Sequence, residues 1–110
     1  MKLMRVVEDG TLDQVVIQPY DVVAVDWLDS VHTGGWLNFS EIDVATHEQA
    51  LYHHSVGYVM RTEGAALWLI QSLQDRWVEG NPLYVDSVMR IPKCAVLRIS
   101  ILARKIDEQS

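Results

Sequence analysis

Short stretches in which apolar and polar residues alternate dominate the chain, and this period of two predicts strands. In the stretch 21–30, Val23, Val25 and Trp27 share one side, which we expect to face the core. The stretch 53–62 alternates in the same way. The stretch 65–73 carries apolar residues on both sides, as is typical of a central strand covered on both faces.

A sharp bend between two strands is predicted near the end of the chain. Proline cannot donate a hydrogen bond to a strand ladder, so the strand over 83–91 should end at Pro92. We expect 91–93 to form a single 3₁₀ turn. In the last strand Leu97, Ile99 and Ile101 should point inward. Small five-stranded barrels of the SH3 and Sm type close through such a bend.

Two further elements complete the predicted fold. Asp9-Gly10 is a hairpin signal, which places an N-terminal hairpin over 1–20. A short helix is expected within 39–52, because Ser40 and Asp43 resemble a capping box. The prediction is a mainly β single domain, a small strongly bent antiparallel sheet or barrel of Sm-like or SH3-like type. It comprises the hairpin, the barrel over 21–102 and a polar tail over 103–110.

Composition narrows the classes of function. The formal net charge of the 110-residue chain is -6, and only two of its nine basic residues lie before residue 61. An acidic chain disfavours a general nucleic-acid binder, which presents a basic face to phosphate. With a single cysteine, Cys94, and no apolar run of about 20 residues, we expect a cytoplasmic protein with no membrane contact.

Four short motifs occur in a fixed order: W-x-D at 27–29, G-W at 35–36, S-x-G at 55–57 and I-P-K at 91–93. Over residues 22–102 the chain resembles small phage and prophage proteins of unassigned function that carry these motifs in this order. The resemblance implies a Sm-like or SH3-like barrel, a host cytoplasm as the location, and no catalytic residue. The N-terminal segment lies outside it.

The candidate binding residues are tryptophans in predicted loops and cations near the bend. Trp36 and Trp77 suit a protein contact or a platform on which a base stacks, and they equally suit lids over the ends of a barrel. Arg90, Lys93 and Arg98 flank the predicted bend, where they could clamp a small anionic ligand such as a nucleotide or pair with nearby carboxylates.

Catalytic and metal sites find less support in the residue pattern. Adjacent histidines in a strand, such as His53 and His54, point to opposite faces, and no metal-binding spacing accompanies them. Asp29, Ser30 and His32 lie close in sequence but lack the context of a hydrolase triad, and we expect strand-end caps instead. We therefore expect no enzyme activity, no cofactor and no metal.

The expected function is that of a non-enzymatic phage-type accessory protein. It would bind a host protein, a defence component being one kind, or sequester a small anionic, nucleotide-like ligand. A Sm-like nucleic-acid-binding module is the alternative, using the same cations and tryptophans. Because exposed strand edges pair readily between subunits, we also expect a homo-oligomer, with a dimer as the first choice.

Overall fold

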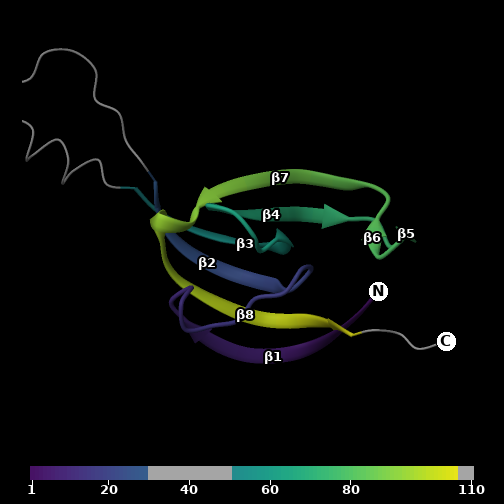
Figure 1. Cartoon of the computed structure of the whole chain (residues 1–110), viewed down its shortest axis with the longest axis horizontal. Coiled ribbons are helices and arrows are strands. Elements are labelled where there is room, and N and C mark those ends of the chain that lie inside the picture. The colour runs from purple at the N-terminus through teal and green to yellow at the C-terminus, as the bar shows by residue number, and fades with distance from the viewer. Residues whose placement is uncertain (30–50, 107–110) are drawn as a thin grey trace, which may run out of the picture.

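A computed structural model describes residues 1–29 and 51–106 of the chain, and antiparallel strands dominate it. Six strands form one sheet, and a pair of two-residue strands forms a second (Figure 1). The elements are β1 (Lys2–Gly10), β2 (Val22–Asp29), β3 (Leu51–Arg61), β4 (Ala66–Leu73), β5 (Trp77–Val78), β6 (Asn81–Pro82), β7 (Val85–Pro92), the 3₁₀ turn η1 (Lys93–Ala95) and β8 (Val96–Ile106).

The large sheet has the order β1-β8-β2-β3-β4-β7. It is an open sheet, because β1 and β7 each pair on one side only within the described part of the chain. The mainly β, antiparallel fold is therefore confirmed, and the sheet does not close into a barrel by strand pairing. The strands curve along their length, and β1 and β7 lie at its two outer sides (Figure 1).

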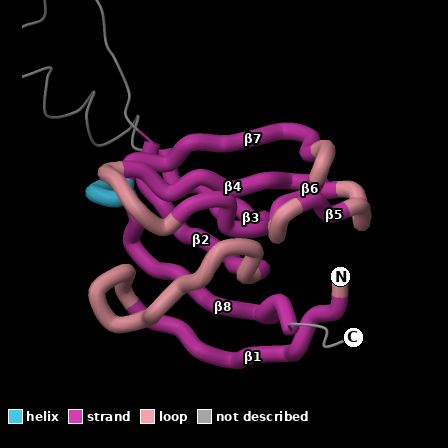
Figure 2. The backbone as a smooth tube through the Cα atoms, turned by 45° about the vertical axis from the view of Figure 1, so that its right-hand side comes forward, coloured by secondary structure: helices cyan, strands magenta, loops and turns pink. Residues whose placement is uncertain are grey.

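The predicted bend is present, with its 3₁₀ turn at 93–95 instead of 91–93. Pro92 is the last residue of β7, and η1 then carries the chain into β8. Because β7 is an edge strand, the missing N–H of Pro92 costs no ladder bond on its open side. Figure 2 shows η1 at the opposite end of the molecule from β5 and β6.

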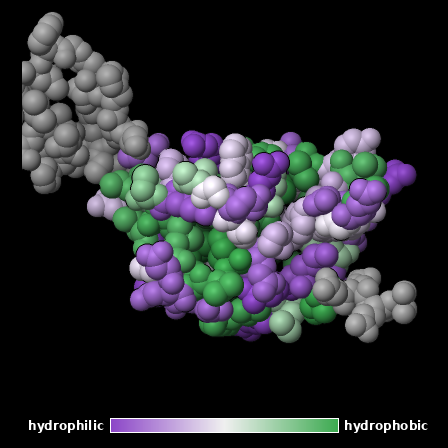
Figure 3. All heavy atoms as spheres, in the orientation of Figure 1, coloured by the Kyte–Doolittle hydropathy of each residue, from purple (hydrophilic) through white to green (hydrophobic). Residues whose placement is uncertain are grey.

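The core follows the predicted alternation in β2. Val23 and Val25 are fully buried members of the hydrophobic core cluster, and Trp27 packs against this cluster. The other buried members of this cluster come from every long strand except β1 and from the loop after it: Val15, Val59, Leu67, Leu69, Ile91, Ile99 and Ile101. Apolar atoms come to the surface at the lower left of the view in Figure 3, where Figure 1 places parts of β1, β2 and β8.

One residue of the last strand departs from its predicted orientation. Ile99 and Ile101 are buried as expected, whereas Leu97 is 49% exposed. The register between β2 and β8 shifts here, since Asp26 pairs with Arg98 but Trp27 pairs with Val96. Leu97 is therefore the extra residue of a bulge, which breaks the alternation of faces.

The predicted N-terminal hairpin is wrong. Residues 2–10 form the single strand β1, which pairs with β8, and residues 11–21 form turns and loop. The local signal at Asp9-Gly10 does mark the end of a strand. The chain then turns through hydrogen bonds from the amides of Gln14 and Val15 to the Thr11 carbonyl, and β8 supplies the partner strand instead.

The predicted polar tail begins too early. β8 continues to Ile106, where it pairs with Lys2 of β1, so residues 103–106 belong to the sheet. The predicted helix within 39–52 falls almost entirely outside the described residues. No helix in the described part of the chain combines the length and apolar character that a membrane span requires.

A buried ion pair fixes the loop after β1 to the sheet. The Asp21 carboxylate is fully buried and accepts hydrogen bonds from Nε and Nη2 of Arg104 at 2.9 and 3.0 Å. Asp21 also accepts from the Gln18 amide, and Arg104 also donates to the Val16 carbonyl. Arg104 on β8 therefore pairs with the buried carboxylate of Asp21, the residue just before β2. Its hydrogen bond to the Val16 carbonyl also fixes the loop to the sheet.

Candidate functional site

The strands β3 and β4 separate part of the way along the sheet. They pair at Tyr58–Ile70, Val59–Leu69 and Arg61–Trp68, and the ladder stops there. On β3, residues 51–57 pair with β2 alone, and on β4, residues 72–73 pair with β7 alone among the described strands. Both segments therefore present an unpaired backbone edge toward the same gap, which we call the β3–β4 fork.

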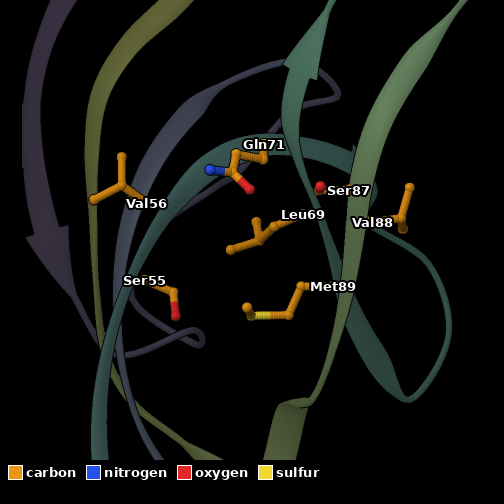
Figure 4. Close-up of a pocket in the computed structure, with 7 residues that line it drawn as sticks. All are labelled: Ser55, Val56, Leu69, Gln71, Ser87, Val88 and Met89. Carbon is orange, nitrogen blue, oxygen red and sulfur yellow. The ribbon is translucent and has the colours of Figure 1, made fainter.

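A groove of about 290 Å³ occupies the fork. Its lining comes from three strands: Ser55 and Val56 of β3, Leu69 and Gln71 of β4, and Ser87, Val88 and Met89 of β7. In Figure 4, Ser55, Leu69 and Met89 point into the space between β3 and β7, whereas Val88 lies on the far side of β7. None of the lining residues carries a charge, so the groove is chemically neutral.

Gly57 lies where the two strands come closest. A Cβ atom at this position would lie 2.9 Å from the Ile70 carbonyl oxygen and 3.2 Å from Leu69 Cβ. A separation under about 3 Å from a backbone oxygen is too short for a side chain, so glycine is what lets β4 pass this close to β3. The fork opens directly beyond this contact.

The β3 wall of the groove is held by an aromatic pair. Trp27 Nε1 donates a hydrogen bond of 3.0 Å to Ser55 Oγ, which fixes the hydroxyl that points into the groove. The Trp27 ring stacks on His53 with 4.6 Å between ring centroids. His53 Nε2 also lies 3.3 Å from the Asp29 carboxylate. The side chain of Ser55 is therefore positioned by its neighbours on β2 and β3.

All three predicted cations already contact groups of the protein. Lys93 Nζ donates to the Thr62 carbonyl at 2.7 Å. Arg98 pairs with Asp9 across the sheet, and this hydrogen bond raises the pKa of the guanidinium. Arg90 is exposed and lies 5.9 Å from the centroid of the Trp68 ring. The three residues thus lie on β7, η1 and β8, and none of them lines the groove.

Trp77 packs at the end of the molecule that holds β5 and β6. Its ring meets Tyr20 edge-on with centroids 4.9 Å apart, its Nε1 donates to Asp75, and Lys105 Nζ lies 5.0 Å from its centroid. The Tyr20 hydroxyl donates to Asn81, and burial raises the pKa of this phenol. These contacts fit a lid over the end of the sheet. The other predicted tryptophan, Trp36, lies outside the described residues.

The histidines form pairs with carboxylates across β2 and β3. His54 Nδ1 lies 2.6 Å from Asp26 Oδ1, on the face of the sheet opposite the His53 ring. Residues 1–29 and 51–106 hold no group of three or more potential metal ligands. Of the three residues close in sequence that we expect to cap a strand end instead of forming a triad, Asp29 ends β2, while Ser30 and His32 fall among the residues that are not described.

Sequence reasoning did not single out the side chains of the groove as a site. Ser55 and Gly57 belong to the S-x-G motif, which is the one signal in the sequence that coincides with the fork. Leu69, Gln71 and Met89 look like ordinary strand residues. Comparisons with protein-family models, with curated proteins and with solved structures found no match for this chain.

Proposed function

We propose that this chain is a non-enzymatic binding protein of the phage accessory type, which takes an extended segment of a partner protein into the β3–β4 fork. The observation that carries the proposal is the neutral groove bordered by two unpaired strand edges. Backbone N–H and C=O groups on an open edge can hydrogen-bond an added strand, and a neighbouring groove can take its alternate side chains.

The chemistry of the groove indicates which segment would bind. Leu69 and Met89 offer apolar contact, while Ser55 and Gln71 offer neutral hydrogen-bonding groups. A phosphate or a strongly charged side chain would meet no opposite charge in this lining. We therefore expect an uncharged segment rich in apolar and β-branched residues, supplied by a protein of the host cytoplasm.

An SH3-like relationship for the sheet is part of the proposal. Strands β8-β2-β3-β4-β7 follow one another in space, and the 3₁₀ turn at 93–95 joins the outer strand β7 to β8. This arrangement supports a small SH3-like sheet in which β1 is added beside β8. An interaction role suits such a sheet because its ligands can use the gap between diverging strands.

A screen with a library of short random peptides tests the proposal. Purified wild-type protein should select uncharged, extended sequences. Gln71→Lys, which places a charge at the groove but leaves β7 unchanged, should weaken the binding of a selected peptide by about tenfold or more, because the ammonium group would be desolvated without a partner.

Val7→Lys is the matched control. Val7 is 85% exposed on β1, away from the fork, so this variant should bind the peptide as the wild type does. Equal affinity of Gln71→Lys and wild type would contradict the proposal. So would preferential binding of single-stranded RNA with a steep dependence on salt, which would favour a nucleic-acid module acting through Arg90, Lys93 and Arg98.

A further inference from the structure

The outer strand β7 is exposed on both of its faces. Six consecutive residues, from Val85 to Arg90, are exposed, and they include Val85, Val88 and Met89 at 42, 45 and 43%. A strand normally buries at least one face against the core. Because β7 also pairs on one side only among the strands of residues 1–29 and 51–106, it presents an open backbone edge together with apolar side chains, which is a template for another strand.

The other outer strand, β1, is a poorer template. Its pairing with β8 shifts register between Arg5 and Glu8, and four of its nine residues are charged. Bulges and charged side chains are the features that keep edge strands from pairing with other chains. The edge of β7 has only Asp86 and Arg90 as charged residues, so it is the edge suited to pairing.

The side chains of β7 are complementary to themselves when the strand is reversed. Asp86, Val88 and Arg90 share one face, since they pair with Ser72, Ile70 and Trp68 of β4 in an unbroken register. Ser87 between them has a φ of 57°, yet the register continues on both sides of it. Two antiparallel copies centred on Val88 would therefore place Asp86 of each opposite Arg90 of the other.

We propose that two copies of this chain pair β7 with β7 in antiparallel orientation, around a two-fold axis at Val88. A two-fold contact requires a surface that complements itself, and the order acid–valine–base meets this requirement. Each pair of opposite charges across two strands adds a favourable contact. Asp86 has no ion pair or hydrogen bond within the described part of the chain, so it is free to take this partner.

The proposal uses the outer edge of β7, whereas the proposed function uses the fork between β3 and β4, so each can fail without the other. Sedimentation velocity over a concentration series measures the oligomeric state. The wild-type chain should be a dimer. Asp86→Arg and Arg90→Asp should each weaken dimerisation by about tenfold or more, because each puts like charges opposite one another.

Mixing these two variants gives the decisive result. The D86R chain has two basic side chains on this face and the R90D chain has two acidic ones, so an equimolar mixture should form a heterodimer. The double variant D86R/R90D restores the self-complementary order and should dimerise alone. Recovery of the dimer in the mixture also shows that the single variants are folded.

Arg5→Asp on the edge of β1 is the control and should leave the dimer intact, because Arg5 lies outside the proposed contact. A wild-type chain that stays monomeric across the series would overturn the proposal. Single variants that dimerise as the wild type does, a mixture that stays monomeric, or a dimer lost only with Arg5→Asp would overturn it as well.

Discussion

At the scale of single residues, Gly57 decides how closely β3 and β4 approach each other before they separate. We expect Gly57→Ala to lower the free energy of unfolding by about 2 kcal/mol, because the new methyl group would lie 2.9 Å from the Ile70 carbonyl oxygen and the backbone would have to shift. Urea unfolding followed by tryptophan fluorescence measures the loss.

Gly10→Ala is the matched control for this variant. A Cβ at position 10 would also meet a close neighbour, 2.7 Å away, but that neighbour is the end of the flexible Gln14 side chain. The Gln14 side chain can move, whereas the backbone at Ile70 cannot. Gly10→Ala should therefore lower the free energy of unfolding by less than Gly57→Ala does. If Gly10→Ala proves the more destabilising of the two, the close approach at Gly57 is not what constrains that position.

At the scale of elements, Arg104 connects β8 to the loop that precedes β2. We expect Arg104→Met to destabilise the protein by about 3 kcal/mol, because the fully buried Asp21 carboxylate would lose its charged partner. Arg98→Met on the same strand should cost much less, since Arg98 and Asp9 are both more than half exposed. Thermal unfolding of the two variants side by side tests the difference, and equal losses would contradict it.

The sequence allowed some elements to be predicted and not others. The faces of β2 and the bend at Pro92 follow from local signals, namely a strict alternation and a residue that cannot donate a ladder bond. The pairing of β1 with β8 joins the two ends of the chain, and the hairpin signal at Asp9-Gly10 gives no information about so distant a partner. Local patterns therefore located strands without specifying their neighbours.

The fork escaped prediction for a related reason. It exists because β3 pairs with β4 only from Tyr58 onward, while its preceding residues 51–57 lie apart from β4, and this depends on a backbone contact between Gly57 and Ile70 that periodicity does not encode. The cations chosen from the sequence do lie around the bend, but Lys93 and Arg98 turn out to contact Thr62 and Asp9. The sequence does not show these intramolecular partners, because they depend on the fold. With Lys93 and Arg98 already in contact with Thr62 and Asp9, the uncharged groove is the better candidate site.

At the scale of the whole molecule, the open sheet has separate surfaces for two kinds of contact. The fork lies inside the sheet, between strands that are next to each other in its order, whereas the free edge of β7 is at its border. A dimer formed through the border would leave the backbone edges of the fork available. A pair of chains would then present two copies of the groove.

The central claim is that a partner segment adds as a strand at the β3–β4 fork, and residue-resolved amide hydrogen exchange by NMR tests it most directly. Successive N–H groups of a strand point to opposite sides, so in the free protein the amides of residues 52–57 that face β2 should exchange slowly and the others fast. A selected peptide should slow the fast set. If the peptide leaves the amide exchange rates of residues 52–57 unchanged and slows those of residues 90–98 instead, the claim is contradicted.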